Sequence, residues 1–248
     1  MNKSLNKVKK FALDLFFPKF CLGCKKEGTF LCEDCKSILE ISEHNYCLCN
    51  KNPFRLPIDQ KGGKCNKCSD KRLSGLYFAL PYKEKSLTRK LIHQFKYEPY
   101  TKSLAKTLAG LLIEHLVITK KNTDEIWDNS ILVPVPLDKN KLKIRGYNQS
   151  EELAKELSGV LEIPMTSEIL IKTKSTKPQM ELKKEEREKN LVGAFITKNS
   201  ARSDLALFKK VFLVDDVYTT GSTMEECARV LRGAGVKQVW GIVIAREE

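Results

Sequence analysis

The sequence of 248 residues has no long apolar run, and this bears on where the protein resides. No stretch reaches the roughly 18 consecutive apolar residues of a membrane-spanning helix, so no transmembrane segment is expected. The first 21 residues place lysines before an apolar segment, as a secretory signal does. That segment has only seven residues, contains Asp14 and precedes Pro-Lys-Phe, so it is not expected to be a cleaved signal. We therefore expect a cytoplasmic protein, with a short docking helix formed by the helically spaced apolar residues between 5 and 16.

A GxxxxGK[ST] run is also missing, which excludes a Walker-type nucleotide site. Basic residues, in contrast, are abundant and unevenly placed. Residues 1–100 contain 20 Lys and Arg against 10 Asp and Glu, whereas residues 101–248 contain 24 against 21. Such an excess fits a solvated surface and fits an anionic partner such as nucleic acid equally well, so both interpretations stay open.

Eight of the nine cysteines lie between residues 21 and 68, in four closely spaced pairs. Two thiolates three residues apart can bind one metal ion from a tight turn, and two such turns complete a four-sulfur zinc site. The pattern predicts one or two structural zinc ions per chain, held by Cys21, Cys24, Cys32 and Cys35 and by Cys47, Cys49, Cys65 and Cys68. The second set is the weaker prediction, because a single residue separates Cys47 from Cys49. The alternatives are free structural thiols and disulfides, and disulfides are disfavoured without export. Cys227 is expected to be a small core residue.

Bound zinc would change the charge balance and the folding of the N-terminal part. Two four-thiolate zinc sites would lower the N-terminal excess from about +10 to about +6, which weakens the nucleic-acid interpretation. Residues 1–75 are too few to bury much core, so metal binding is expected to drive their folding. We therefore predict an N-terminal helix and zinc-binding double-knuckle domain over 1–75 and a second domain over 76–248.

Strands alternate with helices after residue 75, which predicts an α/β fold with a mostly parallel, covered sheet. The expected strands are 76–82, 131–136, 211–214 and 238–245, and the expected helices are 86–97, 103–118, 151–161 and one beginning at Ser222. A basic loop is expected over 137–150.

One strand ends in an acidic pair followed by a Thr-Thr-Gly-Ser-Thr turn at a helix start. Ligands of open α/β sheets bind beyond the C-terminal ends of strands, and free N–H groups at a helix start favour a phosphate. Gly221 allows close approach of the backbone to that phosphate. The carboxylates of Asp215 and Asp216 would repel the phosphate but suit sugar hydroxyls or a cation nearby. A ribose 5-phosphate satisfies both requirements.

The segment VFLVDDVYTTGST resembles the phosphoribosyl-pyrophosphate loop of type I phosphoribosyltransferases. The paired cysteines, LIHQFKY, VPVPL, RGYNQSEELA, TKPQ, REKNLVGAF and this loop occur in the order seen in the ComF competence-protein family. The resemblance spans roughly residues 15–246 and implies a type I phosphoribosyltransferase-like mostly parallel sheet with a small N-terminal zinc-binding segment. In that family the CLC position is usually CxxC, so the second zinc site is the less certain inference.

The resemblance also implies roles for individual residues. Asp215 and Asp216 would bind the ribose hydroxyls, and the 5-phosphate would lie against Thr219, Thr220, Gly221, Ser222 and Thr223. The turn after VPVP would bind pyrophosphate, bridged by Mg²⁺, with Leu137, Asp138 and Lys139 as candidates. Lys143 and Arg145 are either further cations of that site or ordinary surface residues. His93, Gln179 and Arg187 are weaker candidates, and no catalytic residue is identified.

Two functions are compatible with these observations. The first, implied by the family, is a competence protein that binds phosphoribosyl pyrophosphate or related phosphoribosyl groups and supports single-stranded DNA uptake in natural transformation, with DNA-uptake or recombination proteins as partners. Aromatic and basic residues that would suit DNA are Tyr46, Lys51, Phe54, Arg55, Lys96, Tyr97 and Tyr100. DNA, however, lacks the 2-hydroxyl that the carboxylates would prefer. The alternative is an active phosphoribosyltransferase that transfers ribose 5-phosphate to a base or amine in nucleotide salvage.

Overall fold

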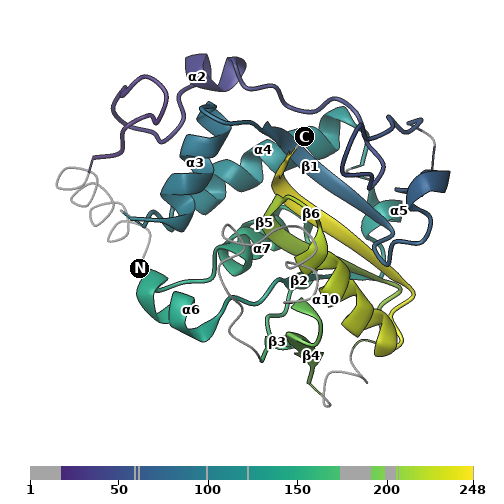
Figure 1. Cartoon of the computed structure of the whole chain (residues 1–248). Helices are drawn as coiled ribbons and strands as arrows, with labels where there is room; N and C mark the ends of the chain where they lie inside the picture. Colours follow the sequence, from purple (N-terminus) through teal and green to yellow (C-terminus); the bar gives the residue numbers. More distant parts are fainter. Residues whose placement is uncertain are drawn as a thin grey trace, which may run out of the picture.

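A computed structural model describes residues 18–58, 60, 62–98, 100–121, 123–173, 191–198, 205 and 207–247. The predicted N-terminal docking helix, Gln179 and Arg187 lie outside the described residues. Figure 1 shows a central sheet with helices on both of its faces. The predicted division between residues 75 and 76 stays a prediction.

The central sheet has four strands in the order β1-β6-β5-β2, and every neighbouring pair is parallel. Its strands are β1 (Gly75–Tyr82), β2 (Ser130–Pro134), β5 (Lys210–Tyr218) and β6 (Gln238–Glu247). Their side chains are nearly all buried, as expected where both faces of a parallel sheet are covered. The predicted α/β class with a mostly parallel sheet is confirmed.

Three helices cover one face of this sheet. They are α3 (Leu87–Lys96), α4 (Leu104–Ile118) and α7 (Gln149–Leu161), and each begins within two residues of the predicted start. Their apolar residues share one core with Phe212 and Val214 of β5, which alternate along the strand with residues of the opposite face. This packing brings the C-terminal end of α3 to the edge of the sheet where β5 ends.

The opposite face is covered by α10 (Ser222–Gly233), by an antiparallel hairpin and by the segment that carries the second set of cysteines. The hairpin consists of β3 (Leu170–Lys172) and β4 (Phe195–Thr197). Cys227 lies in this core with no exposed surface, as predicted. Leu48, Leu56 and Leu73 place the cysteine segment directly against the sheet.

Shorter helices complete the described elements: α2 (Glu33–Ser37), η1 (Asn66–Cys68), α5 (Asp124–Trp127) and α6 (Lys139–Arg145). The prediction of a loop throughout 137–150 was wrong, because α6 lies within it. Asp138 caps this helix by accepting hydrogen bonds from the backbone N–H groups of Asn140 and Lys141. Among the described residues, no helix combines the length and the apolarity needed to cross a membrane.

Candidate functional site

A cavity of about 720 Å³ opens beyond the C-terminal ends of β2 and β5. The acidic pair, the five residues of the Thr-Thr-Gly-Ser-Thr turn and Leu137 all line it. The remaining walls come from α3, α6, α7 and the hairpin, which contribute residues far apart in the sequence. The cavity therefore lies where parallel α/β sheets place their ligands, and its volume is typical of a small-molecule site.

Both aspartates belong to β5, which continues to Tyr218 and does not end at Val214 as predicted. The strand continues because Asp215, Val217 and Tyr218 keep their parallel register with β6. Asp215 accepts a hydrogen bond from the Ser150 hydroxyl at 2.9 Å. On Asp216, Oδ1 pairs with the Lys96 ammonium group at 2.8 Å, and the side chain of Asp216 is 5% exposed.

One oxygen of the acidic pair is left without a protein partner. Asp216 Oδ2 is buried and has no hydrogen-bond partner among the described residues. Burying an unsatisfied carboxylate oxygen is unfavourable, so a hydroxyl donor from a ligand would stabilise this site. Asp216 itself is one of the residues that line the cavity.

Electrostatics in the cavity favour a ligand that brings hydroxyl donors to these carboxylates. Burial, followed by the adjacent charge of Asp216, raises the pKa of Asp215 to about 7. Burial lowers the pKa of Lys96, but the charge of Asp216, the hydrogen bond to it and the charge of Asp215 together outweigh burial and raise the pKa. Lys96 therefore stays charged and compensates the acidic pair.

The turn after β5 is shaped to receive an anion. Gly221 has φ of 79° and is the N-cap residue of α10, whose first backbone N–H groups point from the helix start. The hydroxyls of Thr220 and Ser222 lie 2.7 Å apart, and the first hydroxyl also accepts the N–H of Ser222. The positive end of the α10 dipole, its first backbone N–H groups and the hydroxyls of Thr220 and Ser222 therefore lie together at one end of the cavity, as in phosphate sites.

Three lysines line the cavity: Lys96, Lys141 and Lys172. Lys172 comes from the hairpin and lies over the ring of Phe195, 5.5 Å from its centroid. Burial, with a contribution from the charge of Lys141, lowers the pKa of Lys172. These cations, which sequence analysis did not assign to the site, suit a ligand with several negative charges.

The predicted pyrophosphate residues fall into two groups. Leu137 lines the cavity, whereas Asp138 serves as the cap of α6 and is not in the cavity wall, and neither is Lys139. Arg145 donates to Gln149 and lies over the ring of Tyr97, so its charge acts beside the cavity. Lys143 is exposed.

His93 and Tyr97 also line the cavity, with ring centroids 4.7 Å apart. His93 lies in the last turn of α3, which reaches the cavity, and Tyr97 is the C-cap residue of this helix. The sequence pattern places His93 on this helix but does not show which side of the helix faces a ligand.

The first cysteine tetrad consists of Cys21, Cys24, Cys32 and Cys35, whose sulfur atoms all lie within 4.8 Å of one another. Cys24 Sγ and Cys32 Sγ are 3.5 Å apart, close to the spacing of about 3.8 Å that tetrahedral Zn–S bonds require. The Cys32 N–H donates to Cys21 Sγ. Burial raises the pKa of Cys21, yet backbone donors that include Cys24 and Cys32 prevail and lower it to about 6. The tetrad thus stabilises a thiolate and can hold a metal ion.

The second tetrad consists of Cys47, Cys49, Cys65 and Cys68, and its sulfur atoms also lie within 4.8 Å of one another. Cys65 Sγ is 3.6 Å from Cys49 Sγ and 3.7 Å from Cys68 Sγ. These distances show that the CxC spacing of Cys47 and Cys49 is compatible with a metal site. The Phe54 N–H also donates to Cys47 Sγ and closes the turn. Both predicted sets of four cysteines therefore come together as clusters that could hold a metal ion.

Residues 147–247 match the family described as the phosphoribosyl transferase domain. Competence protein F of Haemophilus influenzae is 37% identical over 161 residues, covering 62% of this chain and 67% of the relative. The chain belongs to the ComF family. The DNA utilization protein YhgH of Escherichia coli is 35% identical over 153 residues, covering 60% of this chain and 64% of the relative. Competence protein ComFC of Streptococcus pneumoniae is 26% identical over 218 residues, 87% of each chain.

The chain thus spans about two thirds of the length of the first two relatives. In this ComF-family chain the matched phosphoribosyltransferase domain contains β5, the turn after it and α10. The cysteine tetrads and α3, which supplies Lys96 to the cavity, lie outside the matched residues. The cavity is therefore built from both parts of the chain.

Proposed function

We propose that this protein binds phosphoribosyl pyrophosphate, or a related phosphoribosyl group, in the cavity beyond β5. The 5-phosphate binds the turn formed by Thr219, Thr220, Gly221, Ser222 and Thr223, and Asp215 and Asp216 accept hydrogen bonds from the ribose hydroxyls. Leu137 and the lysines of the cavity border the pyrophosphate, and Arg145 adds charge nearby. This arrangement matches each group of the ligand with an oppositely charged or hydrogen-bonding partner.

The buried, unpartnered Oδ2 of Asp216 is the observation that carries this proposal. A helix start alone would bind many anions, and an acidic residue alone would bind many cations. Here Asp216, whose Oδ2 lacks a donor, lines the same cavity as the turn proposed for the phosphate. A ligand that combines a phosphate with vicinal hydroxyls satisfies both.

We assign structural zinc to both tetrads and Mg²⁺ to the pyrophosphate. Four thiolates with no exchangeable position are typical of structural zinc. Mg²⁺ would neutralise part of the charge on the pyrophosphate, and the carboxylates and lysines of this chain would orient the rest. Asp138 already caps α6, so the backbone of the turn after β2 is the more suitable contact for the bound ion and phosphates.

Calorimetric titration with phosphoribosyl pyrophosphate and Mg²⁺ tests the site. Replacing both acidic residues, Asp215→Ala with Asp216→Ala, should abolish binding without unfolding the protein, and Asp216→Asn should weaken it by on the order of tenfold or more. The control Asp128→Asn makes the same chemical change at an exposed residue just before β2. This residue lies at the N-terminal end of the strand, whereas the cavity lies beyond its C-terminal end, so binding should be unchanged. Equal affinity in wild type and the double variant would refute the site.

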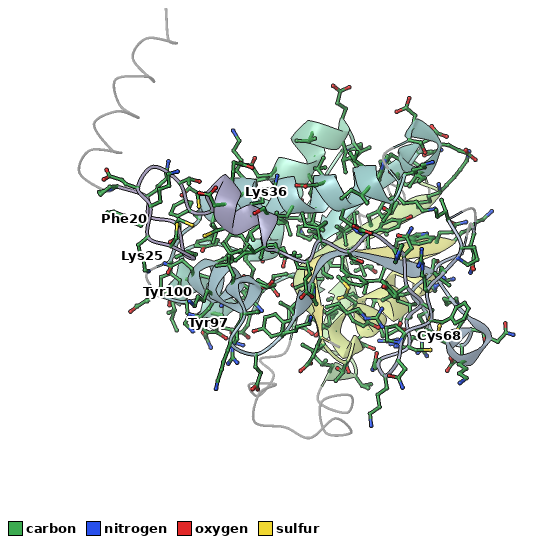
Figure 2. All side chains as sticks on the ribbon, turned by 90° about the horizontal axis from the view of Figure 1, so that it is seen from above. Phe20, Lys25, Lys36, Cys68, Tyr97 and Tyr100 are labelled. Atoms are coloured by element: carbon green, nitrogen blue, oxygen red, sulfur yellow. The ribbon has the colours of Figure 1, made fainter. Side chains whose placement is uncertain are left out.

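We further propose that the protein supports uptake of single-stranded DNA in natural transformation. The printed names of its relatives, competence proteins and DNA utilization proteins, support this process. Figure 2 shows Phe20, Lys25, Tyr97 and Tyr100 toward one end of the molecule, where Phe20 and Lys25 are exposed. Aromatic rings and cations at one end suit a strand whose bases are unpaired.

Transformation of the source organism with linear DNA tests this second proposal. Deletion of the gene should eliminate transformants, and a copy of the wild type should restore them. The variant with both aspartates replaced by alanine should fail to restore them if phosphoribosyl binding serves the process. Undiminished transformation after deletion would contradict a role in uptake.

Catalysis is the alternative, and the cluster of cavity lysines favours it. Displacement of pyrophosphate from the ribose C1 carbon by a nitrogen nucleophile needs stabilisation of negative charge on the leaving group. Lys141 and Lys172 lie in the cavity wall where they would supply it, while Lys96 pairs with Asp216. An assay of pyrophosphate release with each common base or amine should then show acceptor-dependent turnover. Binding without turnover for every acceptor would leave the protein a phosphoribosyl-binding member of the family.

A further inference from the structure

The second tetrad is joined directly to the phosphate-binding turn. Asn50 follows the ligand Cys49, and its Nδ2 group donates to the carbonyl oxygen of Thr220 at 3.0 Å. The two residues are 170 positions apart in the sequence. This contact fixes the peptide that immediately precedes Gly221, and therefore the place where the backbone turns toward the ligand.

Lys71, three residues after the ligand Cys68, makes a second contact of this kind. Its ammonium group donates to the Tyr218 hydroxyl at 3.1 Å and to Asn50 Oδ1 at 3.4 Å. The ring of Tyr218 packs so closely under Gly221 that a Cβ there would collide with it. Lys71 thus holds the ring on which the turn rests.

Arg246 connects the cysteines to the same ring from inside the protein. Its guanidinium group donates to the carbonyl oxygens of Cys47 and Cys49 and is 1% exposed. It lies 5.6 Å from the centroid of Tyr218, which is also its register partner in the sheet. A buried cation beside four cysteines is suited to a zinc–thiolate cluster, which carries a net negative charge.

Helix α10 also forms hydrogen bonds with the segment that follows Cys68. The backbone N–H of Arg72 donates to Glu225 Oε2 at 2.8 Å, and Arg232 donates to the carbonyl oxygen of Arg72. Glu225 lies in the first turn of α10. The residues after Cys68 therefore contact the helix whose N-terminus faces the cavity.

The first tetrad has a different position. Figure 2 shows Cys68 at the opposite end of the molecule from Phe20 and Lys25, which flank Cys21 and Cys24 of the first tetrad. Cys21, Cys32 and Cys35 share the core of α3 and α4, whereas Cys47 and Cys68 share the core of α10. The two tetrads thus serve different parts of the fold.

We propose that the metal held by Cys47, Cys49, Cys65 and Cys68 sets the affinity of the phosphate-binding turn. Asn50 and Lys71 act as its positioning residues. When the metal fixes the two cysteine turns, Asn50 holds the Thr220 carbonyl and Lys71 holds Tyr218, so that Gly221 and the start of α10 are preorganised for the 5-phosphate. Without the metal the two contacts lose their anchor. The proposal rests on the proposed phosphoribosyl site and adds a determinant of its affinity.

Matched variants separate positioning from general structure. Asn50→Asp keeps the acceptor for Lys71 but removes the donor to Thr220, and Lys71→Met removes the ammonium group. The controls Asn66→Asp and Lys67→Met make the same changes at exposed residues between Cys65 and Cys68. The affinity for phosphoribosyl pyrophosphate should fall by about tenfold in each test variant and stay unchanged in each control. Metal content should be equal in all five proteins.

Amide hydrogen exchange at residues 219–223 supplies a readout that does not need the ligand. Exchange should be faster in Asn50→Asp, in Lys71→Met and in Cys49→Ser, which loses the second metal, than in wild type. Cys24→Ser, which loses the first metal, should leave the turn as protected as in wild type. By reciprocity of linked equilibria, phosphoribosyl pyrophosphate should in turn tighten zinc binding by the second tetrad, measured by competition with a chelator.

The outcomes distinguish this inference from the proposed function. If wild type binds no phosphoribosyl pyrophosphate, the proposed function fails, while the exchange data still report on the coupling. If wild type binds and the test variants bind as tightly as their controls, the coupling is overturned and the site stands. Equal exchange at 219–223 in Cys49→Ser and Cys24→Ser would also overturn the coupling.

Discussion

The titration of Asp215 should be measurable through the pH dependence of folding stability. Its pKa of about 7, raised by burial and then by the charge of Asp216, lies above the ordinary value of 3.8. Between these pH values the folded protein holds a proton that the unfolded chain has released, so the contribution of Asp215 to stability is present at low pH and is lost as pH rises through 7.

This shift predicts a difference between wild type and Asp215→Asn, which cannot titrate. Lowering the pH from 8 to 6 should raise the free energy of unfolding of wild type by about 1 kcal/mol relative to the variant. Urea unfolding of both proteins at several pH values, with zinc present, measures this difference. Because both proteins share every other titrating group, a constant difference between them across this range would contradict the assigned environment of Asp215.

The sequence pointed to the acidic pair and to the turn proposed for the phosphate because both lie within nine consecutive residues. Local spacing was enough to suggest a ligand with a phosphate and hydroxyls. Lys141 and Lys172 could not be found in this way, since they come from α6 and from the hairpin, and only tertiary packing brings them to one cavity. Lys96 was noted among aromatic residues that would suit DNA, whereas the structure pairs it with Asp216.

At the scale of the element, the start of α10 depends on a backbone conformation that few residues adopt. Gly221 has φ of 79°, and its Cα faces the Tyr218 ring. Any side chain at this position would have to displace the ring or the turn. The geometry of the helix start is therefore fixed jointly by a glycine and by the tyrosine three residues before it.

Gly221→Ala should accordingly destabilise the protein by about 1–3 kcal/mol and weaken phosphoribosyl pyrophosphate binding. Gly233→Ala is the matched control, because it changes the last residue of the same helix, where a Cβ would meet nothing within 4 Å. That control should be neutral or slightly stabilising. Thermal unfolding and calorimetric titration of both variants measure these effects, and equal behaviour of the two would show that the conformation at Gly221 is unimportant.

Element boundaries were predicted less well than element types. The apolar run of β5 stops at Val214, so the sequence suggested that the strand stops there, but pairing with β6 extends it to Tyr218. In the same way a single carboxylate, Asp138, begins a short helix within a segment that basic residues made look like a loop. Backbone pairing and capping decided both boundaries, and neither has a strong signal in hydrophobic pattern.

At the scale of the whole molecule, two cysteine tetrads that could hold metal ions join the N-terminal segment to the sheet at different places. One shares a core with α3 and α4, the other with α10 and the hairpin. The cysteine spacing predicted both tetrads, but the sequence could not show that Asn50, beside the second one, contacts the turn that lines the cavity, because Asn50 and Thr220 are 170 residues apart.

Metal analysis of the purified protein should give about two zinc ions per chain. Cys24→Ser and Cys49→Ser should each reduce the value to about one, and each should lower the thermal midpoint, because metal binding and folding are coupled. The control Cys227→Ala removes the ninth cysteine, which lies in the core of α10, and should retain both ions. A single zinc ion per wild-type chain would contradict the assignment of zinc to the second tetrad, and no zinc would contradict both assignments.

A crystal structure of the protein with phosphoribosyl pyrophosphate and Mg²⁺ tests the central claim most directly. The account predicts the 5-phosphate against the backbone N–H groups at the start of α10 and a ribose hydroxyl within hydrogen-bonding distance of Asp216 Oδ2. A ligand whose sugar lies away from both aspartates, with Asp216 Oδ2 still lacking a donor, would contradict it.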